Sequence, residues 1–69
     1  MKEIWIVRTT NDKYGNPRYL IDLTHFPECY KLGKQKRNQP NVRVVTSYDI
    51  EKDINECYNE KVKVNILYM

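Results

Sequence analysis

The chain has 69 residues, a formal net charge of +3 and two cysteines. A chain of this length forms one small domain that buries only about 60% of its unfolded surface. No apolar run approaches the roughly 20 residues of a membrane-spanning helix, and Met1-Lys2-Glu3 leads directly into a short strand pattern without the apolar segment of a secretory signal. Two cysteines are too few for a disulfide scaffold, so we expect free thiols and a cytoplasmic protein with no membrane partner.

The first third of the chain predicts an antiparallel β-hairpin. Residues 3–9 and 18–23 are rich in β-branched and aromatic side chains, as strands are. Between them, residues 11–17 form a polar turn cluster in which Gly15 tolerates positive φ and Pro17 donates no backbone hydrogen bond. We therefore expect the two strands to pair through a long polar turn.

The middle of the chain is polar and basic. Pro27 suits the first position of a helix and Gly33 suits its end, which predicts a short helix over residues 27–32. The following segment, GKQKRNQPN at residues 33–41, contains no apolar residue apart from Pro40. We expect a mobile basic loop at residues 31–41.

The last third predicts a strand, a helix and a strand. Residues 42–46 form a β-branched run, and residues 46–49 suit the start of a helix. A hydroxyl of Thr46 or Ser47 can accept from a free amide, and Asp49 can reach back to the backbone or favour the positive end of the helix. Residues 62–68 alternate with a period of two, which indicates a half-buried strand. Between them one helical stripe of apolar side chains recurs at Ile50, Ile54, Cys57 and Tyr58.

Together these elements predict an α+β two-layer sandwich. Its sheet has four strands and is mostly antiparallel, and one main helix covers one face. The packed face of the sheet is expected to carry Ile4, Ile6, Tyr19, Ile21, Val42, Val44, Val62, Val64 and Ile66. The other face is expected to remain uncovered and to carry Trp5, Arg18, Leu20, Arg43, Lys61 and Lys63.

Charge is divided unevenly along the chain. Residues 31–47 contain five bases and no acid, and residues 49–60 contain five acids and one base. The two regions are either solvated surfaces that attract each other or parts of a binding surface. The candidate binding residues are Trp5, Arg18, Lys31, Lys34, Lys36, Arg37, Arg43, Lys61 and Lys63.

No established catalytic or metal-binding motif is present. His25 and Cys29 lie four residues apart and offer a base and a nucleophile, but they match no motif with a defined context. With Cys57 and Asp22 they supply four possible zinc ligands, without a C-x-x-C knuckle or a second histidine. We therefore expect no enzyme, no metal and no cofactor.

Two binding functions remain. Tyrosine, tryptophan and arginine are enriched at protein-binding hot spots, and an open sheet offers edges and a face, which favours a protein partner or a homodimer. The basic loop and Trp5 instead suit a nucleic-acid-binding module. A small enzyme that uses His25 is a third and more distant class.

Two short segments carry a resemblance. Residues 14–19, YGNPRY, precede an alternating strand, and residues 46–51, TSYDIE, open a helix. Together they resemble small uncharacterised accessory proteins of bacteriophages and prophages. The resemblance implies a phage protein that acts without catalysis, by binding a host or anti-viral defence protein in the host cytoplasm. It supplies no active site.

Overall fold

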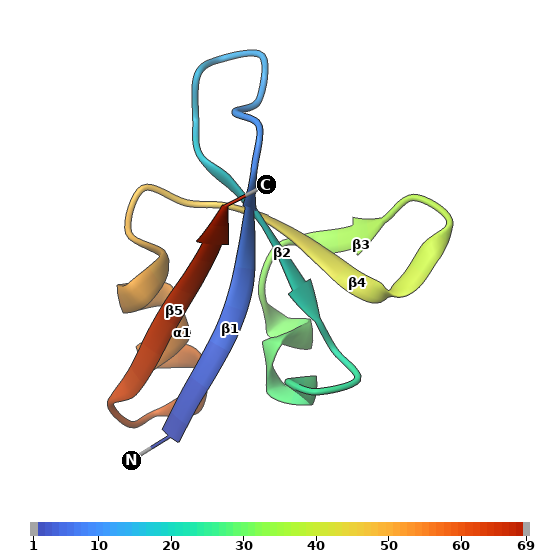
Figure 1. The fold of residues 1–69 in the computed structure, drawn as a ribbon. Helices are drawn as coiled ribbons and strands as arrows, with labels where there is room; N and C mark the ends of the chain where they lie inside the picture. Colours follow the sequence, from blue (N-terminus) through green and yellow to red (C-terminus); the bar gives the residue numbers. More distant parts are fainter. Residues whose placement is uncertain (1, 69) are drawn as a thin grey trace.

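The computed structural model describes residues 2–68, and within this range the chain folds into a five-stranded mixed sheet with one α-helix and one short 3-10 helix (Figure 1). The strands follow the order β3-β4-β2-β1-β5, and β1 pairs in parallel with β5 while the other pairings are antiparallel. The elements are β1 (Lys2–Thr9), β2 (Arg18–Asp22), η1 (Pro27–Lys31), β3 (Lys34–Lys36), β4 (Gln39–Thr46), α1 (Ile50–Tyr58) and β5 (Val62–Tyr68). The α+β class, the hairpin and the single main helix are confirmed; the expectation of four strands is wrong.

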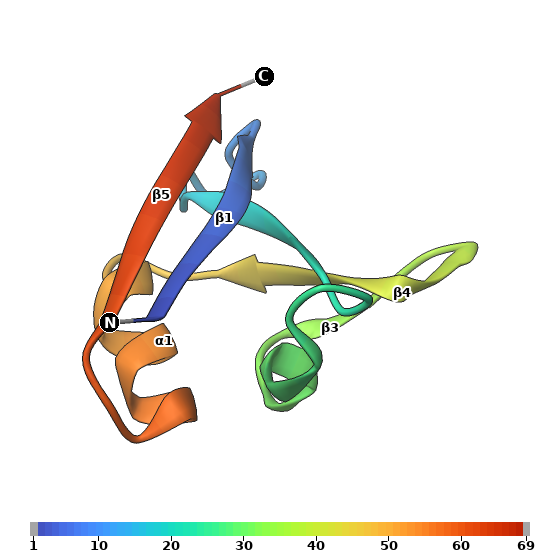
Figure 2. The same cartoon turned by 60° about the horizontal axis from the view of Figure 1, so that its bottom comes forward.

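Both helical segments lie on the same side of the sheet (Figure 2). Strand β4 runs in the same direction as β5, because each antiparallel pairing between β4, β2 and β1 reverses the chain and β1 is parallel to β5. The connection through α1 therefore passes over β2 and β1 before it reaches the far edge. In the described part of the chain no helix covers the opposite face, which we call the open face.

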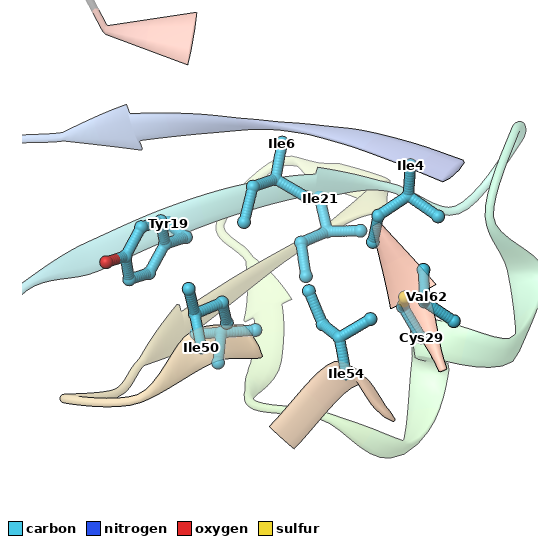
Figure 3. Close-up of a cluster of buried hydrophobic side chains, with 9 residues drawn as sticks. Ile4, Ile6, Tyr19, Ile21, Cys29, Ile50, Ile54 and Val62 are labelled. Atoms are coloured by element: carbon cyan, nitrogen blue, oxygen red, sulfur yellow. The ribbon is translucent and has the colours of Figure 1, made fainter. Parts of the chain in front are cut away.

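The core lies between the sheet and the helices. Ile4, Ile6 and Ile21 point from the strands toward Ile50 and Ile54 of α1 (Figure 3). These five isoleucines are between 0% and 5% exposed. Fully burying one such side chain contributes about 1.5–3 kcal/mol, so these contacts hold the two layers together. The expected core phases of the first, second and last strands are confirmed.

Local signals set the limits of α1. Asp49 is the N-cap, and its carboxylate accepts a hydrogen bond from the Lys52 amide at 3.1 Å. Asn59 ends the helix in the left-handed conformation at φ 54°, where its amide donates to the carbonyls of both Asn55 and Glu56. Both caps satisfy backbone groups that the helix leaves without an internal partner.

The basic segment is a β-hairpin, so the expectation of a mobile loop at residues 31–41 is wrong. Lys34–Lys36 pairs with β4, and a two-residue turn at Arg37 and Asn38 joins the strands. Asn38 takes positive φ, 65°, which asparagine tolerates better than most residues. Pro40 fits within β4 because it lies beyond the pairing with β2, which begins at Val42, and beside a register shift in β3.

Strand β4 also has the opposite phase from the one expected. Val45 is buried opposite Tyr19, whereas Val44 lies opposite Leu20 on the open face. Arg43 lies opposite Ile21 and therefore on the helix side. There its guanidinium donates from Nε to the Leu32 carbonyl at 3.0 Å and from Nη2 to the Gly33 carbonyl at 2.8 Å. These bonds satisfy the charged group and link β4 to the end of η1.

Candidate functional site: the open face of the sheet

An apolar row crosses the open face. Val7 of β1 lies opposite both Leu20 of β2 and Leu67 of β5, and Leu20 lies opposite Val44 of β4. Directly opposed residues share a face, so these four side chains form one continuous line across four strands. Lys34, opposite Val44, ends the line on β3. We call the four side chains the apolar row.

Two large apolar side chains on this face remain in contact with solvent. Trp5 is 49% exposed and Leu67 is 54% exposed. Trp5 lies opposite Asn65, two residues along β1 from Val7, and therefore borders the apolar row. Exposed apolar side chains that adjoin one another on one face indicate a candidate binding surface.

A hollow of about 240 Å³ opens at one end of the apolar row. Leu20 and Val44 supply apolar walls that belong to the row. Four polar side chains complete the lining, and they come from the end of β1, the start of β2 and the β3–β4 hairpin: Thr9, Arg18, Lys36 and Arg37. We call these six residues the basic hollow.

Local structure positions the bases of the hollow. Arg18 donates from Nε to the Thr10 carbonyl and from Nη2 to the Thr10 hydroxyl, both at 2.9 Å, so its guanidinium is held in one orientation. The register of β3 shifts between Gln35 and Lys36. Such irregularities redirect side chains, and Lys36 here borders the hollow. The turn after β3 carries Arg37 to the same place.

None of these three bases forms an ion pair within residues 2–68, although the backbone hydrogen bond from Asn16 and, in smaller part, the charge of Arg18 lower the pKa of the Asp12 carboxyl. The ion pairs in that range join His25 to Asp22 and Lys63 to Glu3. Like charges around one hollow repel one another, and an anion placed between them removes that repulsion. The basic hollow is therefore an arrangement that favours an anionic group.

A second hollow, of about 350 Å³, lies at the ends of β1 and β5 beside Arg8, Thr10 and Tyr68. Its only base within the described residues is Arg8, which already donates to the Thr9 carbonyl and the Asn11 side chain. This hollow is larger, but one base lines it whereas three line the basic hollow, so the basic hollow is the better anion site.

The structure brings some of the nine candidate binding residues together and separates others. Those on the open face or at its hollow are Trp5, Arg18, Lys34, Lys36, Arg37 and Lys63. Arg43 lies on the opposite side, Lys31 ends η1, and Lys61 lies just before β5 instead of within it. Arg43 and Lys63 thus share neither a face nor neighbouring strands.

Sequence reasoning missed four residues of this surface: Val7, Thr9, Val44 and Leu67. Val7 and Leu67 alternate with core residues, so their phase alone places them on the open face. For Val44 the sequence predicts a place in the core, because β4 carries valines at both phases and periodicity does not choose between them. Nothing in the sequence marks Thr9 as part of a hollow.

His25 and Cys29, the possible catalytic base and nucleophile, contact different partners in the structure. His25 is exposed and its Nδ1 lies 2.9 Å from the Asp22 carboxylate. Cys29 is completely buried, and its Sγ lies 3.7 Å from the Tyr58 hydroxyl. Among residues 2–68 no group of three or more histidine, cysteine or acidic side chains is arranged to hold a metal ion.

Burial shifts the pKa values of the neighbouring Cys29 and Tyr58 side chains. Loss of solvent raises the pKa of the Cys29 thiol and also raises the pKa of the Tyr58 hydroxyl. A thiol with a raised pKa is a poor nucleophile at neutral pH, because little thiolate is present. The environment of Cys29 is therefore that of a core residue.

No helix within residues 2–68 has the length and apolar character needed to cross a membrane. Comparisons with protein-family models, with curated proteins and with solved structures found no significant match. Function must therefore be argued from the surface itself.

Proposed function

We propose that this protein acts without catalysis, by binding another protein through the open face of its sheet. The observation that supports this most directly is the apolar row, together with the exposed side chains of Trp5 and Leu67. A protein partner would cover this row and remove its apolar surface from water, at roughly 25 cal/mol for each Å².

Charge adds specificity to the proposed contact. Arg18, Lys36 and Arg37 gather at one end of the row, and Lys63 lies on the same face beyond Trp5. The arrangement of an apolar centre with a charged border is common at protein interfaces, and complementary charge speeds association. We expect a partner with an acidic rim.

The resemblance to phage accessory proteins suggests where to look for this partner. In that reading the protein works in the cytoplasm of an infected bacterium and engages a host protein or a component of a defence system.

The test is affinity capture from a bacterial host lysate, with and without nuclease. The bait is the full chain, and a Trp5→Ser/Leu67→Ser variant is compared with a Tyr30→Ser variant. Tyr30 is 59% exposed but lies on η1, on the other side of the sheet, so it serves as a matched control. We expect a nuclease-resistant partner that the double variant loses and the control retains.

Capture that depends equally on Tyr30 and on Trp5 would contradict the proposal, as would capture that neither variant changes. Sedimentation of the pure protein separates a further outcome, in which the second copy of the chain is itself the partner. Loss of every partner after nuclease treatment would favour the alternative.

The alternative is a nucleic-acid-binding module. The observation in its favour is the gathering of Arg18, Lys36 and Arg37 near an open face that also carries Trp5, because cationic grooves and aromatic platforms bind single strands. Against it, the lining of the basic hollow contains no aromatic side chain on which a base would stack.

A further inference from the structure

We infer that the basic hollow receives a carboxylate side chain from an extended segment of the partner, and that apolar side chains of the same segment lie along the apolar row. The inference rests on the proposed function and specifies the chemistry of the partner. It assigns an anion-recognising role to Arg18, Lys36 and Arg37.

The first argument is the state of the three bases. Lys36 and Arg37 make no side-chain hydrogen bond or ion pair with any of residues 2–68, and Arg18 retains its Nη1 group. Arg18 is nevertheless fixed by Thr10, so its fork is ordered before a ligand arrives. Guanidinium groups pair with carboxylates through two parallel hydrogen bonds, and a fixed fork loses less entropy on binding.

The second argument is the join between the hollow and the row. Leu20 and Val44 belong to both, so a ligand in the hollow is in contact with the apolar surface. Neighbouring strands lie about 4.8 Å apart, so the four strands of the row span about 14 Å, which an extended segment covers with four or five residues. An acidic residue at one end and two apolar residues at alternate positions would match this surface.

The aliphatic walls favour a peptide over a nucleic acid. Bases bind by stacking on aromatic faces, and the one tryptophan of the chain, Trp5, does not line the hollow. Aliphatic walls instead suit the aliphatic or aromatic side chain next to an acidic residue. The volume of about 240 Å³ suits one or two side chains and is below the usual size of a small-molecule pocket.

The experiment is an NMR titration of the full isotope-labelled protein with a probe peptide whose two termini are chemically capped. In this peptide leucine alternates with serine, and two aspartates follow at one end. A matched peptide carries asparagine in place of both aspartates. We expect the aspartate peptide to shift amide signals of the basic hollow and the apolar row. It should bind about tenfold more tightly than the asparagine peptide, because hydrogen bonds to charged groups are stronger than those between neutral groups.

Two double variants with the same loss of charge complete the test. Lys36→Gln/Arg37→Gln removes bases that make no hydrogen bond within the described chain, so folding should be unaffected. Lys31→Gln/Lys61→Gln removes two bases that lie outside the hollow. We expect the first variant to lose most of the preference for aspartate and the second to keep it.

Equal binding of the two peptides would overturn the inference, and so would equal effects of the two variants. An absence of NMR shifts at the hollow with millimolar peptide would also overturn the inference. So would generic single-stranded DNA that shifts these signals at a lower concentration than the aspartate peptide does. If the captured partner needs Trp5 and Leu67 but survives Lys36→Gln/Arg37→Gln, the proposed function stands and this inference alone fails.

Discussion

Ile54 is one of the two isoleucines through which α1 packs on the sheet, and it is completely buried. Replacing it with alanine removes apolar contacts and leaves a cavity that a small core has little means to refill. We predict that Ile54→Ala lowers the free energy of unfolding by about 2–5 kcal/mol. Lys52→Ala, on the exposed side of the same helix, should change it by less than about 0.5 kcal/mol. Denaturant melts with equal effects for the two variants would contradict the observed helix phase.

The two thiols differ in environment. Cys29 is completely buried, whereas Cys57 is partly accessible and donates to the Glu28 carbonyl at 3.0 Å. We predict that a maleimide labels Cys57 in the native protein and reaches Cys29 only after unfolding. Mass spectrometry reads the labels, and the intact native mass should show two free thiols and no zinc. Early labelling of Cys29, a loss of 2 Da or a zinc adduct would each contradict this.

Titration of Cys29 gives a pH dependence with a defined sign. Its pKa is raised by burial, so the folded state favours the protonated thiol more than the unfolded state does. This stabilisation is complete below the ordinary thiol pKa of about 8.5 and is lost as pH rises from there through the raised value. We predict that the free energy of unfolding falls above this pH, and that Cys29→Ala makes the fall less steep. Denaturant melts at several pH values give the free energy of unfolding as a function of pH for both proteins. The same slope for the original chain and for Cys29→Ala would contradict the prediction.

At this scale the sequence predicts the buried face of β1 and β2 correctly, although both strands also carry apolar residues at the other phase, Trp5, Val7 and Leu20. The buried residues are Ile4 and Ile6 in β1 and Tyr19 and Ile21 in β2. In β4 the sequence predicts the wrong phase: Val45 is the buried valine, and Arg43 on the same face donates to the Leu32 and Gly33 carbonyls. That contact joins residues about ten positions apart and is invisible to periodicity.

The junction between η1 and β3 depends on Gly33. Its φ is 57°, and a Cβ at this position would overlap the backbone carbonyl of Val44 in β4. Gly15 also has positive φ, 83°, but a Cβ there would meet nothing. We predict that Gly15→Ala costs only the backbone term of about 1–2 kcal/mol, and that Gly33→Ala costs distinctly more because β3 must separate from β4. Equal melting temperatures of the two variants would contradict this account.

The β3–β4 hairpin is the element that sequence reasoning could not supply. Lysine and glutamine are poor indicators of a strand, and glycine and proline on either side indicate a loop. The strand forms because β4 offers it an open edge, and lysines are common on edge strands, where they discourage pairing with other chains. Tertiary pairing thus overrides local propensity at residues 34–36.

At the scale of the whole molecule, charge is separated across the sheet. Helix α1 carries acidic side chains, with Glu51 and Asp53 in its first turn, and it packs on the side of the sheet opposite the open face (Figure 2). The bases of the basic hollow lie on the open face. Within residues 2–68 no ion pair joins the two groups. The expected attraction between the basic segment and the acidic helix therefore does not take the form of a direct ion pair in this part of the chain.

The candidate surface was predictable only in part. Trp5, Arg18 and Lys63 follow from strand phase, since each alternates with a core residue. Lys36 and Arg37 were recognised as basic, but their place at the hollow depends on a turn and a register shift that sequence does not reveal. Lys31 and Lys61 have the same charge as the bases of the hollow but lie elsewhere. A count of bases in the sequence therefore overestimates the number of bases at the site.

Salt dependence distinguishes the two proposed functions for the molecule as a whole. Neutralising Z phosphates makes log K fall with log salt at a slope of about −0.7Z for single strands, so three bases would give a slope of about −2. A protein contact centred on Trp5 and the apolar row is much less sensitive, because apolar burial is not screened.

We predict that generic DNA and RNA bind no more tightly than micromolar at physiological salt, while capture of the protein partner survives a moderate increase in salt. Gel-shift titrations at two salt concentrations measure the first, and repeated capture measures the second. The decisive variant is Lys34→Gln/Lys36→Gln/Arg37→Gln, because these three bases lie together on the hairpin and their replacement leaves the side chains of the apolar row unchanged. Tight nucleic-acid binding with a steep salt slope, abolished by this variant, would replace the protein-binding function with the nucleic-acid one.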